Sequence, residues 1–253
     1  MGAPVALLPT VERRFGAALA GLRLAQKPGG GVPAYTRWVN RRLARFAAAA
    51  AYTVGLSPNA VTGISAIVSL AGLVLVVALP ATPWVGLAVG TLLALGYVLD
   101  SADGQVARLG RRGSPAGEWL DHVVDAIRTP AIHLAVAIAM SVAPAGSRVV
   151  AGVAIAYALL SSGQFMSQIL SEQLSGARAP ASDTAGRVQS FALLPTDMGT
   201  LCVIFLAWGF PTAFAWLYVA LFVVNALHAM VSMRRKYARL TSLSKSPAAA
   251  PAR

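Results

Sequence analysis

Six runs of apolar residues follow one another along most of the chain, with short polar stretches between them. They cover residues 59–80, 83–103, 118–143, 148–172, 196–210 and 212–233. A helix that crosses a bilayer needs about 20 predominantly apolar residues, so the fifth run is short for a crossing. The pattern predicts an all-α integral membrane protein with six transmembrane helices.

A different pattern precedes the first run. Between residues 33 and 55, Arg37, Arg41 and Arg45 recur at four-residue steps, while Trp38 faces elsewhere. Residues four apart share one face of a helix. We therefore expect an amphipathic juxtamembrane helix on the cytoplasmic membrane surface. A solvated helix packed on a partner protein is the alternative.

These patterns divide the chain into four segments. Residues 1–31 form a basic, flexible N-terminal leader, and 33–55 the amphipathic interfacial helix. Residues 56–235 form the six-helix transmembrane domain, and 236–253 a disordered cytoplasmic tail of low complexity. In the leader the charges follow a short apolar run, which is the reverse of their order in a signal peptide.

Composition supports a membrane protein and excludes some other classes. Hydrophobic residues make up 57% of the 253 residues and charged residues only 12%. The net charge of +12 does not indicate nucleic acid, because the basic residues border the apolar runs instead of gathering in one domain. They suit contact with anionic membrane lipids. The single cysteine, Cys202, excludes an internal disulfide and a cysteine-based metal site.

The basic residues also predict the orientation. Four segments are basic: the N-terminal region, the loop near Arg108, the connection with Arg178 and Arg187, and the tail. In the turns on the opposite side, the only basic residue is Arg148. Loops rich in Lys and Arg stay in the cytoplasm. We expect a multi-pass protein of the inner (plasma) membrane, with both termini and any site near Arg108 on the cytoplasmic side.

Five of the nine acidic residues lie between the second and third runs, at Asp100, Asp103, Glu118, Asp121 and Asp125. Ionisable groups at a bilayer are costly and usually functional. Asp100 and Asp103 are three apart and Asp121 and Asp125 four apart, so each pair shares a helix face. Two such faces packed together would gather four carboxylates, which are the ligands that hard divalent cations prefer. Charges that merely anchor two helices are the alternative, although anchors are normally Lys and Arg.

The same region resembles a known family. Eight positions have the residues and spacing of the CDP-alcohol phosphotransferase (CDP-alcohol phosphatidyltransferase) signature: Asp100, Asp103, Gly104, Ala107, Arg108, Gly117, Asp121 and Asp125. Upstream, Pro58, Asn59 and Thr62 resemble the element that opens the first span in that family. The resemblance covers about residues 55–235.

The resemblance implies an enzyme of phospholipid biosynthesis. Such enzymes transfer a phosphatidyl or other phosphoalcohol group from a CDP-alcohol, commonly CDP-diacylglycerol, to a hydroxyl acceptor and release CMP. It makes 56–235 the catalytic domain and implies Mg²⁺ or Mn²⁺, two ions per site, and a homodimer. The acceptor stays open between inositol phosphate, glycerol 3-phosphate, serine and a lipid alcohol.

The resemblance also implies roles for individual residues. The metal ligands would be Asp100, Asp103, Asp121 and Asp125. The catalytic residues would be Asp121 and Asp125, with Asp125 as the general base. The residues that bind the CDP group would be Asn59, Thr62, Gly104, Ala107, Arg108 and Gly117.

The acceptor site has no comparable motif. Many family members have a basic residue directly after the last aspartate, but Ala126 follows Asp125 here. The candidate phosphate-binding residues are therefore Arg128, one turn further on, and Arg178 and Arg187 in the third cytoplasmic connection. The topology rule explains these arginines equally well.

Two other functions remain possible at this level. A cation transporter or channel would use the aspartate cluster as its ion site, although such carboxylates more often lie near the bilayer midplane on broken helices. A catalytically idle scaffold is the other, and the presence of all four aspartates argues against it.

Polar residues from Ser161 to Gln168 suit either a polar cavity or helix packing, and His133 is expected to form an interhelical hydrogen bond.

Overall fold

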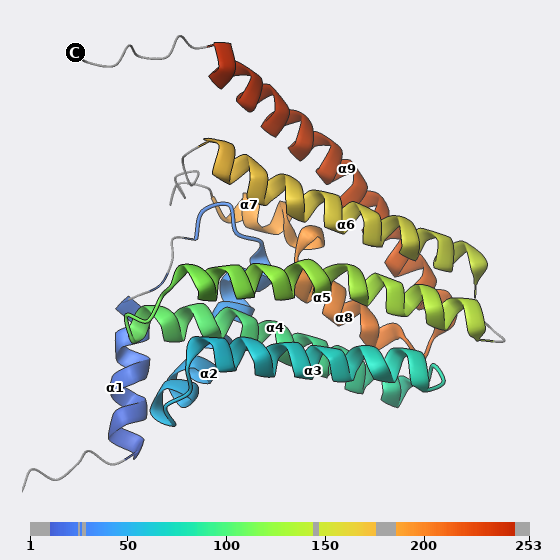
Figure 1. Cartoon of the computed structure of the whole chain (residues 1–253). Helices are drawn as coiled ribbons and strands as arrows, with labels where there is room; N and C mark the ends of the chain where they lie inside the picture. Colours follow the sequence, from blue (N-terminus) through green and yellow to red (C-terminus); the bar gives the residue numbers. More distant parts are fainter. Residues whose placement is uncertain (1–10, 25, 27–28, 144–146, 176–185, 246–253) are drawn as a thin grey trace, which may run out of the picture.

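All regular structure in the described part of the chain is helical (Figure 1). The computed structural model describes residues 11–24, 26, 29–143, 147–175 and 186–245. Within these residues, five helices are long and apolar enough to cross a membrane. They are α3 (Pro58–Ala78), α4 (Pro83–Leu109), α5 (Pro115–Val142), α6 (Arg148–Ser175) and α9 (Pro211–Lys245). The prediction of an all-α, multi-pass membrane protein is confirmed at this level.

The shorter helices lie before the first long helix and between α6 and α9. They are α1 (Val11–Leu24), the π-helix η1 (Thr36–Asn40), α2 (Arg41–Thr53), α7 (Arg187–Ala192), the 3-10 helix η2 (Leu194–Thr196), α8 (Met198–Ile204) and the 3-10 helix η3 (Phe205–Ala207). The segment 33–55 is thus largely helical, and the leader contains α1. Residues 236–245, assigned to the tail, continue α9, whereas 246–253 lie outside the described residues.

The two helices that carry the signature, α4 and α5, and the helix that carries the upstream element, α3, begin alike. Each has a hydroxyl residue at its N-cap, followed by proline at the first helical position: Ser57, Thr82 and Ser114. The cap oxygen accepts a backbone N–H three residues further on. Such caps satisfy N–H groups that have no partner within the helix, and proline suits the first turn. The starts of α3, α4 and α5 are therefore well defined.

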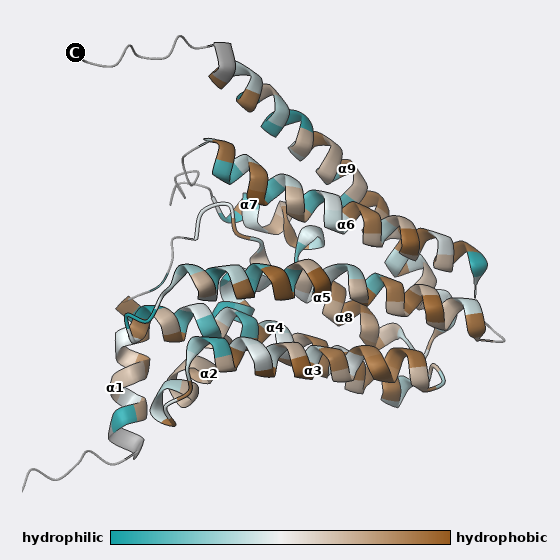
Figure 2. Cartoon of the chain, in the orientation of Figure 1, coloured by the Kyte–Doolittle hydropathy of each residue, from teal (hydrophilic) through white to brown (hydrophobic). Residues whose placement is uncertain are grey.

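Helices α3, α4, α5 and α6 alternate in direction (Figure 1), so the start of α3, the end of α4 and the start of α5 meet at one end of the bundle. We call this end, near Pro58, Leu109 and Pro115, the site end. Figure 2 shows hydrophilic residues there and mainly hydrophobic ones along the rest of the helices. Helix α1 lies across the site end, where Leu22 is buried in an alanine-rich cluster with Ala44 of α2.

Most of the large buried side chains lie in a separate apolar cluster formed mainly by α3, α4, α5, α6, α8 and α9. Its aromatic members include Phe205, Trp208, Phe214 and Tyr218. The Trp208 and Phe214 rings meet edge to face with centroids 4.8 Å apart, a favourable aromatic geometry. This cluster holds the C-terminal helices against the bundle.

The fifth predicted run forms two short helices instead of one long one. The apolar segment Met198–Ala207 is about 15 Å long at 1.5 Å per residue, half of a hydrocarbon core of about 30 Å. It packs closely along α4, where a Cβ on Gly86 would lie 2.7 Å from the Phe205 carbonyl oxygen and one on Gly90 3.1 Å from that of Cys202. Glycines at these positions let the two backbones approach.

Asp197, at the start of this segment, connects it to the residues before α2. The carboxylate is 3% exposed and accepts hydrogen bonds from the Thr36 backbone N–H at 2.7 Å and the Thr36 hydroxyl at 2.9 Å. The same hydroxyl lies 2.6 Å from the Tyr97 hydroxyl on α4. Nearby, the Asn40 amide donates to Ser101 Oγ at 2.6 Å. Helix η1 is thereby fastened to the helix that carries the first two motif aspartates.

The close approach at Gly86 gives a test of the fold. We expect Gly86→Ala to lower the free energy of unfolding by about 1–3 kcal/mol, because the added methyl group overpacks the contact with the Phe205 backbone. SDS-induced unfolding in mixed micelles measures the change. Gly63→Ala on α3 is the control: a Cβ there meets nothing within 4 Å, so its effect should stay within about 1 kcal/mol. Equal effects of the two substitutions would contradict the packing of η3 on α4.

Candidate functional site

A cavity of about 530 Å³ lies at the site end, between the start of α3, the end of α4 and the start of α5. Its lining includes every residue predicted to bind CDP: Asn59, Thr62, Gly104, Ala107, Arg108 and Gly117. Asp103 and Asp121 line the same cavity. Residues from three helices and two sequence elements are thus brought to one space.

Several lining residues have no role assigned to them from the sequence. They are Pro58, Arg112, Gly113, Ser114, Pro115, Glu118 and His122. Most of them belong to the turn between α4 and α5 or to the first turns of α5. Their places in the sequence, within or beside the signature, could have indicated that they line the cavity, because the turn joins the two helices that carry the signature.

Three of the motif aspartates converge. Asp100, Asp103 and Asp121 each offer a carboxylate oxygen, and these oxygens lie within 4.8 Å of one another. Asp103 is buried, with 5% of its surface exposed. Carboxylates this close repel one another unless a cation neutralises them, and hard divalent cations take oxygen ligands. The donor set therefore fits a divalent metal ion.

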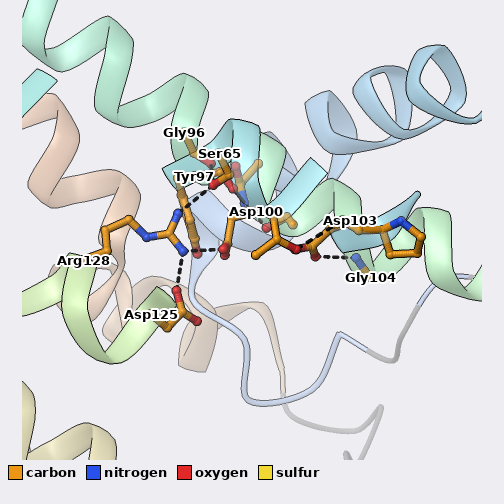
Figure 3. A network of polar contacts seen from close by, with 12 residues as sticks. Ser65, Gly96, Tyr97, Asp100, Asp103, Gly104, Asp125 and Arg128 are labelled. Carbon is orange, nitrogen blue, oxygen red and sulfur yellow. Dashed lines mark hydrogen bonds and ion pairs between the residues drawn. The ribbon is translucent and has the colours of Figure 1, made fainter. Parts of the chain in front are cut away.

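Asp103 is held by two donors from its surroundings. The Thr62 hydroxyl of α3 donates to Asp103 Oδ2 at 2.5 Å, and the Gly104 backbone N–H donates to Asp103 Oδ1 (Figure 3). The sequence predicts Thr62 as a CDP-binding residue. Its observed partner shows that the element at the start of α3 also orients a carboxylate of the signature on α4.

Arg128 lies inside the acidic cluster. Its guanidinium forms ion pairs with Asp100 and Asp125 and donates to Ser65 Oγ at 2.9 Å (Figure 3). The sequence predicts Arg128 as an acceptor-binding residue, but these contacts commit it to two motif aspartates. Asp125, predicted as a fourth metal ligand, is not among the three converging aspartates and contacts this guanidinium.

Of the other two predicted acceptor residues, the structure describes Arg187 alone. Arg187 begins α7, is exposed, and is not among the lining residues of the cavities described here. Arg178 lies outside the described residues. Their roles stay predictions from the sequence.

A second cavity, of about 340 Å³, lies between α5, α6, η2, α8 and α9. Its polar lining comprises Thr129, His133, Tyr157, Ser161, Gln164, Gln168, Thr196, Asp197, Asn225, His228, Ser232 and Lys236. The polar cavity considered for the fourth apolar run is therefore present. His133 Nδ1 also lies 2.7 Å from the Tyr218 hydroxyl, which is the interhelical hydrogen bond expected of it.

One face of α5 connects the two cavities. Asp121, Asp125, Thr129 and His133 follow one another at four-residue steps, so they share a helix face. Asp121 lines the first cavity, and Thr129 and His133 line the second. Asp125 lies between them, with 32% of its side chain exposed.

Residues 55–231 match the family model described as CDP-alcohol phosphatidyltransferase. The chain belongs to this family. The matched region contains α3 to α6 and most of α9, with the whole lining of the first cavity and all of the second except Ser232 and Lys236. None of the curated proteins compared with the chain matches it.

Membership in the CDP-alcohol phosphatidyltransferase family identifies the kind of chemistry. Its enzymes transfer a phosphatidyl group from a CDP-alcohol in phospholipid biosynthesis and are in general divalent-metal dependent. The cavity with its acidic cluster fits that chemistry. The cation-transporter interpretation gains no support from the family match.

The contact between Thr62 and Asp103 can be tested by two substitutions. We expect Thr62→Val to lower the free energy of unfolding by about 1–3 kcal/mol, because it removes a hydrogen bond to a buried carboxylate. Thr62→Ser keeps the hydroxyl and should retain most of the stability. SDS unfolding curves of both variants would be compared with the wild type, and equal loss in the two would argue against the hydrogen bond.

Proposed function

We propose that this protein is a membrane phosphotransferase that moves the phosphatidyl group of CDP-diacylglycerol to a hydroxyl acceptor and releases CMP. The observation that carries the proposal is the first cavity, where the CDP-binding candidates of α3, α4 and α5 meet the acidic cluster. Its volume of about 530 Å³ lies in the ordinary range of small-molecule sites. Arg108 and Arg112 in the lining suit the diphosphate of the donor.

Asp100, Asp103 and Asp121 would hold the divalent ion, Mg²⁺ or Mn²⁺. The ion would supply charge neutralisation at the diphosphate. Thr62 and the Gly104 backbone keep the Asp103 carboxylate oriented before any ligand arrives. Preorganised ligands of this kind reduce the reorganisation that binding and reaction require.

Asp125 is proposed as the general base. It is partly exposed between the two cavities, so a hydroxyl group bound in the second cavity would approach it from the side opposite the donor. In the reaction a bond forms between the acceptor oxygen and phosphorus, the bond from phosphorus to the CMP oxygen breaks, and the acceptor proton passes to the Asp125 carboxylate.

We place the acceptor in the second cavity. Its lining offers hydroxyl, amide and imidazole groups, with Lys236 and Asp197 as the charged residues among those that line it. A phosphate group is usually held by several cations. The lining therefore suits an acceptor recognised mainly through hydroxyl or amino groups, such as serine or a polar lipid alcohol, better than inositol phosphate or glycerol 3-phosphate.

Six membrane crossings are proposed for the chain. Helix α6 runs towards the site end, whereas α9 starts at the opposite end, where a Cβ on Gly209 would lie 2.1 Å from the Pro83 backbone nitrogen. The segment with α8 and η3 would therefore make the remaining crossing. In this topology η1 and α2 form the juxtamembrane helix, and the termini and the first cavity face the cytoplasm of an inner (plasma) membrane. A homodimer is a further proposal that the family suggests.

The activity is tested by CMP release from CDP-diacylglycerol, with purified protein, Mg²⁺ or Mn²⁺, and a panel of hydroxyl acceptors. We expect Asp125→Asn to reduce kcat roughly 10²–10⁴-fold, which is the usual contribution of a general base. Binding of CDP should persist, since Asp125 is not among the lining residues of the first cavity.

Glu172→Gln on α6 is the matched control: Glu172 lines neither cavity, and the amide oxygen of the new residue can still accept the hydrogen bond from Gln168, so the variant should retain wild-type kcat. Absence of CMP release with every acceptor, together with absence of CDP binding, would overturn the proposed function.

The acceptor site is tested by Gln164→Leu. Loss of one hydrogen bond in the second cavity should raise the KM for the acceptor about tenfold, while the KM for the CDP-alcohol stays unchanged. Met166→Leu, on the same helix and outside both linings, is the control. A rise in the donor KM alone would place the acceptor elsewhere.

A further inference from the structure

Arg128 is a buried cation in the middle of the acidic cluster. The residue is 8% exposed. One guanidinium nitrogen contacts both Asp100 Oδ1 and Asp125 Oδ1, and a second nitrogen donates to Ser65 Oγ at 2.9 Å (Figure 3). The positive charge thus bridges carboxylates from α4 and α5.

The position of this guanidinium is built into the packing of three helices. Ser65 is completely buried and donates its own proton to the Gly96 carbonyl at 2.8 Å, so its oxygen is left to accept from Arg128. The close approach of α3 and α4 at this level requires glycine at position 96, because a Cβ there would lie 2.2 Å from Ser69 Oγ. The packing of α3 against α4 therefore fixes the Ser65 hydroxyl that accepts from Arg128.

The bridge divides the four motif aspartates into two groups. Asp100, Asp103 and Asp121 offer oxygens within 4.8 Å of one another, and this set suits one divalent ion. Asp125 faces Arg128 instead, and Asp100 belongs to both groups. A second divalent ion bridging Asp100 and Asp125 would lie against the guanidinium, where like charges in a largely buried site repel strongly.

Displacing Arg128 to admit a second ion would also be unfavourable. The guanidinium would leave three side-chain partners, and removing the partners of a buried charge is strongly destabilising. When Arg128 stays in place, its positive charge neutralises the Asp125 carboxylate without a metal ion.

We propose that Arg128 takes the place of a second divalent ion between Asp100 and Asp125, so that each chain binds one catalytic metal ion instead of two. The inference rests on the proposed function, because it takes Asp100, Asp103 and Asp121 as the ion site. Arg128 then acts as a positioning residue that orients Asp125 as the base and is not available to bind an acceptor phosphate.

The test counts Mn²⁺ ions on the full-length protein in detergent, by equilibrium binding and by electron paramagnetic resonance. The wild type should bind one Mn²⁺ per chain and give the spectrum of an isolated ion. Arg128→Met should bind two, and its spectrum should be broadened by coupling between neighbouring ions, because Asp100 and Asp125 lose their cation. Arg128→Lys keeps the charge and should bind one.

Arg148→Met is the control: Arg148 starts α6 at the opposite end of the bundle, so the count should remain one. Size-exclusion chromatography and SDS unfolding identify variants that fail to fold. If Arg128→Met does not fold, the number of ions on the wild type still tests the proposal. Two ions on the wild type, or one ion on a folded Arg128→Met protein, would overturn the proposal. If neither the wild type nor any variant binds Mn²⁺, the assignment of Asp100, Asp103 and Asp121 as an ion site is wrong and the proposal fails with it. The CMP-release assay tests the proposed activity separately.

Discussion

Burial of several carboxylates at one end of a helical bundle is the constraint on which the remaining structure depends. Like charges this close are stable only when each has a compensating partner. Thr62 and the Gly104 N–H serve Asp103, and Arg128 serves Asp100 and Asp125. These partners come from three helices, so the caps that start α3 and α5 and the tight α3–α4 contact are requirements of the site as much as of the fold.

The arrangement also relates the two cavities. A single face of α5 carries Asp121, Asp125, Thr129 and His133, and the cavities lie on either side of Asp125 along that face. In the proposed reaction this row places Asp125 between the donor and the acceptor along α5.

The sequence predicted the features that depend on residues close together in the chain, and missed those that depend on contacts between distant residues. Long apolar runs predicted α3, α4, α5, α6 and α9 because burial in lipid requires little else. The resemblance to the family implied roles for eight of the fifteen residues that line the first cavity, and these roles stay predictions.

The partners of Arg128 were beyond such reasoning, because they depend on the rotamer of one side chain and on the packing of α3 against α4. Ser65 had a faint signal: with Thr62 and Ser69 it forms a polar stripe on an apolar helix. The change from the α-helix α8 to the 3-10 helix η3, directly after Ile204, likewise has no signal in the hydropathy pattern.

The contact between Thr36 and Asp197 bears on where the folding unit begins. The family match starts at residue 55, yet a buried carboxylate at the entrance to α8 takes two of its hydrogen bonds from Thr36. A chain trimmed to the matched region would leave the buried Asp197 carboxylate without these two hydrogen bonds, which costs stability. The residues before α2 therefore help to stabilise the region that defines the family.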